Sequence, residues 1–383
     1  MARPSVVVLG AGFGGLAAAH AIRRGAGDDI ELLVIDHAPT FLMGLRKLWV
    51  LDGRASPGQG GRDRTSLSRA GIPFRQGRVE AFDRDARRVR VDGADTGYDF
   101  LIVALGAQQR IDLVPGEPEG NPNLYTVEGV TEAGQRLRDL EAGRVIIAIA
   151  GVPYKCPPAP YEAAFLIDDL LRREGGRDRF ELEVVTPQPM SVPAAGPAAC
   201  SAIEGRLATK GIRFRPKASL SEARPGALTL EDGDSVRADL LLLVPPHRPP
   251  ALVEDSGLTG ESGWVKVDPA TLRTDDERVF AVGDVVEMTT GTGLPFPKAG
   301  VFAESHGEVV GRNLVDQIAG RQPNAAFDGF GFCFLEVGGG RASMVRGNFL
   351  ASPPDVTIEE DAPEHLTAKE RFESERLERW FPG

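Results

Sequence analysis

The chain has 383 residues, more than one ordinary hydrophobic core accommodates, so two or three domains are expected. Apolar residues make up 42% of it and charged residues 26%, a globular composition that excludes a disordered or fibrous chain. With 44 basic and 55 acidic side chains, the net charge is −11. An acidic surface repels phosphate, so we expect no nucleic-acid partner, and three cysteines are too few for a disulfide-stapled secreted fold.

No apolar run is long enough to span a membrane, and a strand pattern already begins at Ser5, which leaves no room for a signal peptide. We therefore expect a cytoplasmic protein. Peripheral contact with the cytoplasmic face of the membrane stays open.

Apolar runs of β type alternate with helical stretches, which is typical of an α/β fold. The first cycle predicts a helix at 14–25 and strands at 5–9, 31–35, 77–82, 87–91 and 99–104. A second cycle predicts strands at 144–150, 181–185 and 239–244 and helices at 161–173 and 198–210. A strand at 278–282 and a helix at 299–319 follow. The pattern predicts two Rossmann-like domains, the first of them discontinuous. The expected division is 1–112 with 245–322 for the first domain, 113–244 for the second and 323–383 for a C-terminal module.

A glycine-rich turn joins the first predicted strand to the first helix at Gly10-Ala11-Gly12-Phe13-Gly14-Gly15. It fits G-x-G-x-x-G: Gly10 permits the tight turn, Gly12 lets the backbone approach a pyrophosphate, and Gly15 lets helix and strand pack closely. The helix N-terminus supplies N–H groups for the phosphates. Asp36 ends the second strand, where an acid accepts hydrogen bonds from ribose hydroxyls. Together these features predict a dinucleotide site.

Two later strands end in glycine, at 98–106 and 279–284. They resemble the second and third FAD motifs of flavoproteins with two dinucleotide-binding domains. The resemblance implies FAD, held by Gly106, by Gly283 and Asp284 at the ribityl chain, and by Val79 on the strand that faces the adenine.

Residues 40–50 contain no cysteine. The disulfide reductases of this superfamily carry their redox cysteine pair in this stretch, so their mechanism is excluded. The same absence removes the expected anchor for a cysteinyl flavin, and we expect FAD to be bound non-covalently.

The second cycle should carry a nicotinamide nucleotide fingerprint, but its loop keeps one glycine, Gly151, and has prolines at 153, 157, 158 and 160. Proline offers no N–H group to a pyrophosphate. The next strand ends at Thr186-Pro187, without an acid for a ribose. We expect a domain that has kept its fold and lost NAD(P)H; an unusual NAD loop is the alternative.

The segment Lys155-Cys156-Pro157-Pro158-Ala159-Pro160-Tyr161-Glu162 resembles a motif of the sulfide:quinone oxidoreductase and flavocytochrome c sulfide dehydrogenase family. Gly331-Phe332-Cys333 resembles the second redox cysteine of the same family. The resemblance implies that Cys156 and Cys333 meet beside the flavin and handle sulfur; the residues alone leave open that both are structural thiols. Cys200 has no accompanying motif and is interpreted as a small core cysteine.

Sulfide:quinone oxidoreductases often have a third cysteine, followed by a histidine, after the second FAD strand. The corresponding stretch here, 123–129, contains neither. This departure favours the two-cysteine chemistry of the flavocytochrome type.

Two charged residues complete the predicted site. Lys298 precedes the helix 299–319, where the family places a lysine that stabilises negative charge on the reduced flavin; a solvated surface lysine is the alternative. Glu162 starts a helix and either accepts a proton from sulfide or a thiol, or stabilises the helix dipole. The predicted catalytic residues are Cys156, Cys333, Glu162 and Lys298. The predicted cofactor-binding residues are Gly10, Gly12, Phe13, Gly14, Gly15, Asp36, Val79, Gly106, Gly283, Asp284 and Lys298.

Phe330, Phe332 and Phe334 alternate along a predicted strand and either wall a quinone site or belong to the core, of which we favour the core. The C-terminal stretch 366–383 is predicted to be a helix with balanced charges and an apolar side. Membrane-surface helices are usually cationic, so we favour packing on the protein over a membrane or partner contact.

These features lead us to expect an FAD-dependent sulfide dehydrogenase. Hydrosulfide would attack a Cys156–Cys333 disulfide or polysulfide bridge, and two electrons would pass through the flavin to a quinone or cytochrome c. One alternative is an NADH:acceptor oxidoreductase with an aberrant nicotinamide loop. The other is a non-enzymatic, flavin-stabilised redox sensor.

Overall fold

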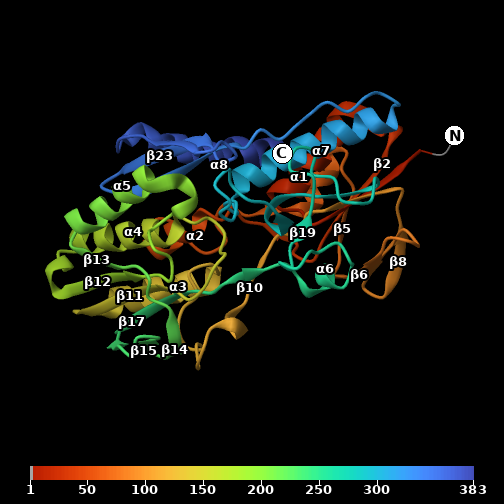
Figure 1. The fold of residues 1–383 in the computed structure, drawn as a ribbon. Coiled ribbons are helices and arrows are strands. Elements are labelled where there is room, and N and C mark those ends of the chain that lie inside the picture. Colours follow the sequence, from red (N-terminus) through yellow and green to blue (C-terminus); the bar gives the residue numbers. More distant parts are fainter. Residues whose placement is uncertain (1–2) are drawn as a thin grey trace.

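In the computed structural model, which describes residues 3–383, two α/β lobes lie side by side and the C-terminal segment extends over both (Figure 1). The first lobe contains a parallel five-stranded sheet in the order β20-β9-β1-β2-β5. Its strands are Val279–Ala281, Phe100–Val103, Ser5–Leu9, Glu31–Asp36 and Phe74–Gln76. Strand β20 follows the second lobe in sequence, so the first lobe is discontinuous. The predicted fold class is confirmed.

Helices α1 (Phe13–Ala26) and α7 (Gly300–Ile318) pack against each other in the first lobe. Glycines make this close packing possible, because a Cβ atom at Gly307 would lie 2.2 Å from the carbonyl oxygen of Gly14. A Cβ atom at Gly311 would lie 2.5 Å from the Cβ atom of Ala21. The first turns of both helices line the same cavity, described below.

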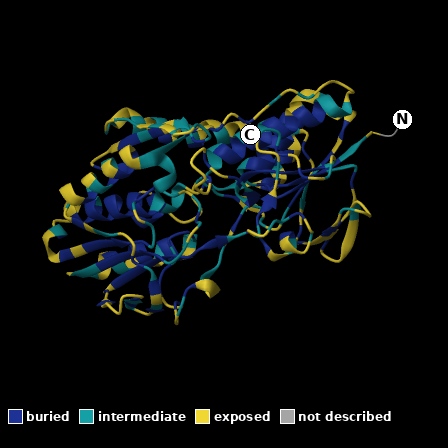
Figure 2. Ribbon diagram, in the orientation of Figure 1, coloured by how far each residue is buried: buried dark blue, intermediate teal, exposed yellow. Residues whose placement is uncertain are grey.

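The second lobe contains a parallel four-stranded sheet in the order β13-β12-β11-β17. Its strands are Ile212–Arg215, Phe180–Val185, Gly143–Ile149 and Leu240–Val244. Its helices are α3 (Val127–Asp139), α4 (Ala159–Arg173) and α5 (Gly196–Thr209). Figure 2 shows the buried residues concentrated in the sheets of both lobes, as expected for parallel strands with covered faces.

Smaller elements complete the two lobes. Antiparallel strands β6 (Val79–Asp83), β7 (Arg88–Val91) and β8 (Ala94–Gly97) belong to the first lobe, and β14 (Leu220–Arg224), β15 (Ala227–Leu230) and β16 (Ser235–Arg237) to the second. The two crossings between the lobes pair with each other as β10 (Gln108–Gln109) and β18 (His247–Arg248). Helix α2 (Arg46–Leu51) comes from the first segment of the chain, yet it packs into the core of the second lobe.

The C-terminal segment forms an antiparallel sheet and one long helix. They are β22 (Phe330–Gly338), β23 (Arg341–Asn348), β24 (Asp355–Ile358) and α8 (Pro363–Trp380). The sheet contacts α4 and α5, whereas Trp380 at the end of α8 packs on Phe13 and Phe41 of the first lobe, with ring centroids 5.2 and 5.8 Å apart. The apolar side of α8 is therefore covered by protein. Among the described residues, no helix combines the length and the apolar content that a bilayer crossing needs.

Candidate active site

A cavity of about 570 Å³ lies where the two lobes and the C-terminal segment meet. Loops at the ends of β2, β9 and β20 contribute to it because the carboxyl ends of parallel strands meet at one edge of a sheet. The loop before α4, strand β22 and helix α8 supply the remaining walls. Of the residues predicted for the site, Gly15 alone does not line the cavity, since it packs inside the first lobe.

The glycine turn leaves one wall of the cavity open to a phosphate. Gly10 has φ +100°, and a Cβ atom there would lie 2.3 Å from the carbonyl oxygen of Ala104. A Cβ atom at Gly15 would lie 1.9 Å from the carbonyl oxygen of Gly10. At Gly12, by contrast, a Cβ atom would meet no described heavy atom within 4 Å. No side chain caps the N-terminus of α1, so its first N–H groups are free to bind a phosphate.

Asp36 holds the glycine turn in place from the end of β2. Its carboxylate accepts hydrogen bonds from the backbone N–H groups of Ala11 at 2.8 Å and Ala38 at 2.9 Å. The buried guanidinium of Arg64 lies 3.6 Å from the same carboxylate and donates to the carbonyl oxygen of Ala11. Sequence reasoning missed Arg64, which lies in a connecting segment without a motif.

Asp284 and Lys298 lie on the wall formed by β20 and α7. Burial raises the pKa of Asp284, while Lys155 and Lys298 oppose that shift. Lys298 is buried and not a surface lysine: its Nζ donates to the carbonyl oxygen of Val286 at 2.6 Å and lies 3.8 Å from the Trp264 ring centroid. Burial lowers the pKa of Lys298 to about 8. The first turn of α7 has no side-chain cap, so it offers N–H groups beside this lysine.

The structure brings Cys156 and Cys333 to the same cavity as free thiols. Cys156 has φ +51°, and its N–H donates to the carbonyl oxygen of Lys298 at 2.6 Å, which ties its loop to the first lobe. Cys333 lies in the middle of β22, opposite Val345 of β23. Hydrogen bonding with Cys333 lowers the pKa of Cys156 and raises the pKa of Cys333. Cys156 is therefore the thiol that ionises first.

Tyr125 occupies the stretch in which the third cysteine is missing. Its hydroxyl donates to the carbonyl oxygen of Cys156 at 3.3 Å, and its ring packs against His247 with centroids 5.0 Å apart.

Cys200 is 2% exposed in the core of the second lobe, in agreement with its interpretation as a core cysteine.

Glu162 belongs to a buried network of charges that reaches the surface. Its carboxylate pairs with Lys369 of α8, and the same ammonium lies 2.8 Å from Glu336 of β22. Glu336 also accepts from Trp49 Nε1 and pairs with Arg54, each at 2.5 Å. Burial raises the pKa of Glu162.

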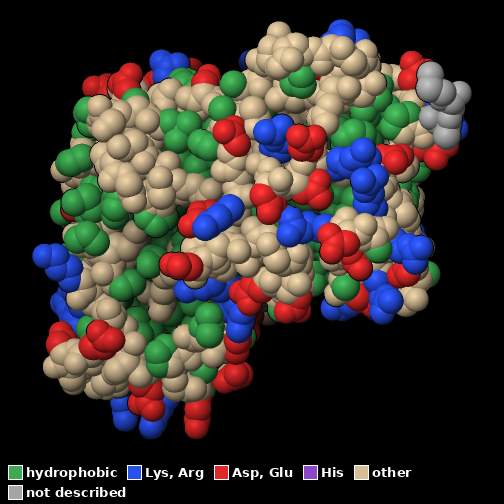
Figure 3. Space-filling model, turned by 45° about the vertical axis from the view of Figure 1, so that its right-hand side comes forward, with side chains coloured by type: hydrophobic (Ala, Val, Ile, Leu, Met, Phe, Trp, Pro, Cys, Tyr) green, Lys and Arg blue, Asp and Glu red, His purple; other side chains and the backbone are tan. Residues whose placement is uncertain are grey.

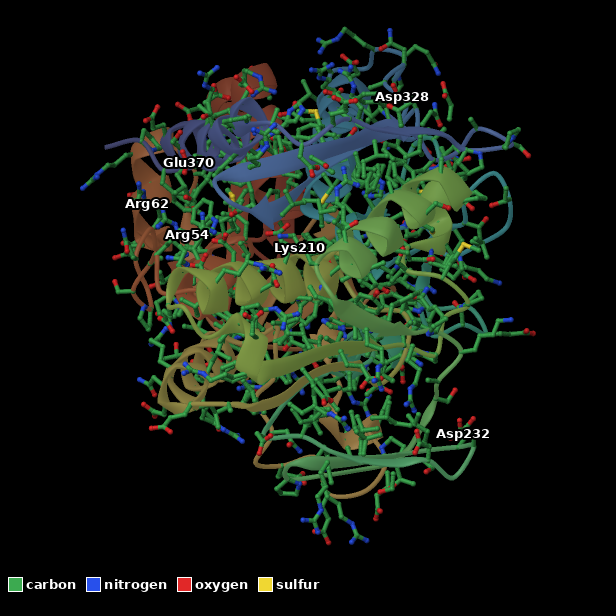
Figure 4. The ribbon with its side chains drawn as sticks, turned by 90° about the vertical axis from the view of Figure 1, so that its left-hand side faces the viewer. Arg54, Arg62, Lys210, Asp232, Asp328 and Glu370 are labelled. Atoms are coloured by element: carbon green, nitrogen blue, oxygen red, sulfur yellow. The ribbon has the colours of Figure 1, made fainter. Side chains whose placement is uncertain are left out.

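At the outer end of this network, Arg54 lies beside the helix that carries Glu370, and both residues line a second cavity (Figure 4). Lys369 is one of the balanced charges of the C-terminal helix, and it is only 3% exposed. Its role in the network was not predicted from the sequence. No local pattern marks Lys369 because its carboxylate partners lie in distant segments.

The aromatic row of Phe330, Phe332 and Phe334 was expected to belong to the core, and this expectation was wrong. Phe332 and Phe334 are half-buried and line the cavity, whereas Phe330 is 50% exposed. Phe372 of α8 faces both, with ring centroids 5.7 and 6.1 Å away. Strand β22 runs along the edge of the cavity, so its phenylalanines meet the rings of another element there.

In the second lobe, the loop that keeps the single glycine of the nicotinamide fingerprint packs against Pro246, next to the crossing between the lobes. A Cβ atom at Gly151 would lie 3.0 Å from the Cβ atom of Pro246. Cys156 and Ala159, at the N-terminal end of α4, line the cavity shared with the first lobe. The helix end that binds pyrophosphate in a Rossmann domain here presents a cysteine.

Comparisons with known proteins agree with this geometry. The mitochondrial sulfide:quinone oxidoreductase of Mus musculus is 24% identical over 379 residues, which cover 94% of this chain and 82% of that protein. The sulfide-quinone reductase of Aquifex aeolicus is 24% identical over 82% of this chain and 76% of its own. The X-ray structure of the Aquifex aeolicus sulfide:quinone oxidoreductase aligns with a TM-score of 0.88 and 22% identity over 98% of this chain and 91% of that one.

The resemblance inferred from the segment 155–162 is therefore confirmed. The family model for pyridine nucleotide-disulphide oxidoreductases matches residues 4–305. The chain belongs to the pyridine nucleotide-disulphide oxidoreductase family.

Proposed function

We propose that this protein is an FAD-dependent sulfide dehydrogenase that oxidises sulfide to sulfur or polysulfide and reduces a quinone. The observation that carries the proposal is one cavity that holds Cys156 and Cys333 as free thiols beside the glycine turn and Asp284. The relatives named sulfide:quinone oxidoreductase support the same reaction.

The residues present fit FAD. The open backbone at Gly12 and the uncapped first turn of α1 suit the pyrophosphate, Asp36 suits a ribose, and Asp284 suits the ribityl chain. When bound, the flavin would accept two electrons from the sulfur centre and give them to the acceptor. Since residues 40–50 contain no cysteine, we propose that FAD is held without a covalent bond. Acid precipitation should then release all the yellow colour into the supernatant.

The two cysteines have different tasks because their thiols differ in acidity. In the oxidised protein they would form a disulfide or polysulfide bridge. Hydrosulfide would attack the sulfur of Cys333 and form a persulfide there. The bond between the bridging sulfurs breaks, and Cys156 leaves as the thiolate, because the thiol with the lower pKa is the better leaving group.

Glu162 is placed to receive the proton that hydrosulfide brings, because its carboxylate lines the cavity of the cysteines. Burial raises its pKa, which strengthens it as a base. The ammonium of Lys369 beside it compensates the charge when the carboxylate is ionised.

A quinone fits the cavity better than a protein acceptor does. Phe332, Phe334 and Phe372 offer aromatic faces inside the cavity, and a flat quinone ring would stack on them. Cytochrome c, as a protein, would have to accept electrons at the surface and could not use these aromatic faces.

The test is anaerobic stopped-flow reduction of the flavin. Sulfide should bleach the oxidised flavin, whereas NADH and NADPH should not, because the loop prolines offer no N–H groups to a pyrophosphate and the strand that ends at Thr186 supplies no acid for a ribose. Decylubiquinone should then reoxidise the protein faster than cytochrome c. Rapid bleaching by NADH would instead favour an NADH:acceptor oxidoreductase, and reduction by sulfide without turnover on either acceptor would favour a redox sensor.

A further inference from the structure

The lysines of this acidic protein are concentrated in one place. The chain contains seven lysines at a net charge of −11. Four of the seven line the cavity of the cysteines: Lys47, Lys155, Lys298 and Lys369. On the outer face seen in Figure 3, by contrast, basic and acidic side chains are interspersed. A positive cavity in a negative protein focuses the field on small anions.

Two of the four cavity lysines contact a charged or aromatic side chain, whereas Lys47 and Lys155 form neither an ion pair nor a cation–π contact with the described residues. Lys369 binds two carboxylates, and Lys298 binds a backbone carbonyl and the Trp264 ring. Within residues 3–383, Lys210 and Lys369 are the lysines that form ion pairs. Lys47 and Lys155 therefore face the cavity without a carboxylate partner.

Lys47 and Lys155 lie at the Cys156 end of the cavity. Lys155 precedes Cys156 in the chain, and its Nζ donates to the carbonyl oxygen of Ala107 at 3.2 Å. Lys47 reaches the same cavity from α2. The two ammonium groups affect each other: burial and then the charge of Lys155 lower the pKa of Lys47 to about 8, whereas the Cys156 thiolate raises it. Glu128 also raises the pKa of Lys47, and Lys155 acts on Asp284 across the cavity, but neither lysine forms an ion pair with these carboxylates. Two neighbouring cations that form no ion pair favour an anion from solution.

We propose that Lys47 and Lys155 form an anion site that draws hydrosulfide to the cysteine pair. This inference rests on the proposed function for the identity of the anion. Hydrosulfide is the nucleophilic, anionic form of sulfide, so a positive site raises its local concentration at the cysteine pair. The phosphate-binding elements, Gly12 and the first turn of α1, belong to the first lobe, whereas Lys155 lies on the loop before α4 of the second lobe.

The test compares two alkylating reagents of similar size and different charge on the reduced, FAD-bound protein. Iodoacetate is an anion and iodoacetamide is neutral, and peptide mapping by mass spectrometry follows the modification of Cys156. The ratio of the two rates reports the local charge, because a change in the pKa of the thiol alters both rates alike. The wild-type ratio should exceed that of N-acetylcysteine by about tenfold, as expected for unit charges a few ångströms away in a partly shielded site.

Lys47→Gln and Lys155→Gln should each lower this ratio by about threefold to tenfold, while Lys47→Arg should keep it. Lys266→Gln is the matched control, since it removes the same charge at an exposed position outside the cavity. A ratio equal to that of N-acetylcysteine in the wild type would overturn the proposal, and this measurement needs no variant to fold. Equal losses of the iodoacetate rate and the iodoacetamide rate in the two glutamine variants would also overturn the proposal.

The same variants separate this inference from the proposed function. If sulfide fails to reduce the wild-type flavin while the alkylation ratio responds to both lysines, the sulfide reaction is wrong and the anion site stands. If sulfide reduces the flavin while the ratio ignores the lysines, the reaction stands and the anion site is wrong. If both hold, the second-order rate constant for reduction by hydrosulfide should fall by about threefold to tenfold in each glutamine variant.

Discussion

The ammonium of Lys369 lies 2.8 Å from the carboxylate of Glu336 and pairs at the same time with Glu162. These side chains come from α8, β22 and α4, so one lysine ties the C-terminal segment to the second lobe. Arg54, also 2.5 Å from Glu336, offsets the second negative charge. The network therefore depends on a cation held between two buried carboxylates.

Replacing Lys369 with methionine should lower the free energy of unfolding by about 3–5 kcal/mol, because the loss of one partner leaves buried charge uncompensated. Urea denaturation measures this loss. Lys266→Met, at an exposed position, should change the free energy by no more than about 0.5 kcal/mol. Adding Glu162→Gln to Lys369→Met should restore part of the loss, and a cost below about 1 kcal/mol for Lys369→Met would show that the carboxylates are neutral or hydrated.

Cys156→Ser and Cys333→Ser should each abolish reduction of the flavin by sulfide while FAD stays bound. Both thiols line the cavity, whereas the glycine turn and Asp284 that suit FAD are unchanged in these variants. Stopped-flow absorbance measures the reduction, and the visible spectrum reports bound FAD. Cys200→Ala is the control: it should leave the rate unchanged, since Cys200 is buried in the core of the second lobe. Full activity of Cys333→Ser would contradict the two-cysteine mechanism.

Much of the fold follows from local patterns that a single sequence displays. The glycine turn, the strand that ends at Asp36 and the alternation of strands and helices each need only neighbouring residues to be recognised. The approach of Cys156 to Cys333 needs the whole fold, and in the sequence only a family resemblance indicates it.

The residues that sequence reasoning missed owe their roles to distant partners. Lys369 resembles any charged residue of an amphipathic helix until Glu162 and Glu336 surround it. Alternating phenylalanines such as those of β22 would look the same in the sequence whether they belonged to the core or lined a cavity. The position of Phe372 in the structure distinguishes these two cases. The alternation of residues along one strand does not show which face of that strand stays uncovered by other elements.

Cys333→Ala should raise the pKa of Cys156. Hydrogen bonding with Cys333 stabilises the Cys156 thiolate, so its removal makes deprotonation harder. The pH dependence of iodoacetamide modification at Cys156 measures this pKa, which should lie below the ordinary thiol value of about 8.5 in the wild type and move upward in the variant. Cys200→Ala should leave the profile in place. A downward movement in Cys333→Ala would mean that the second thiol does not support the thiolate.

Two glycines of the turn should respond differently to alanine. Gly12→Ala should fold normally and bind FAD at least about tenfold more weakly, because its Cβ atom meets no described protein atom and projects toward the phosphate wall. Gly15→Ala should instead lower the free energy of unfolding by about 1–3 kcal/mol, since its Cβ atom would lie 1.9 Å from the carbonyl oxygen of Gly10. FAD titration and urea denaturation of both variants test the pair. Equal effects of the two substitutions on both measurements would argue against the phosphate role of Gly12.

Phe372→Leu should raise the KM for decylubiquinone by about tenfold and leave the reduction of the flavin by sulfide unchanged. Leucine keeps an apolar side chain but removes the flat face that a quinone ring would stack on, and such aromatic contacts contribute about 0.5–1.5 kcal/mol beyond burial. Phe330→Leu is the matched control on the same aromatic row, because Phe330 is 50% exposed and does not line this cavity. Steady-state turnover with varied quinone gives KM, and anaerobic stopped-flow gives the sulfide step. If Phe372→Leu slowed the sulfide step and left KM alone, the aromatic wall would serve the cysteines, and the quinone would have to bind elsewhere.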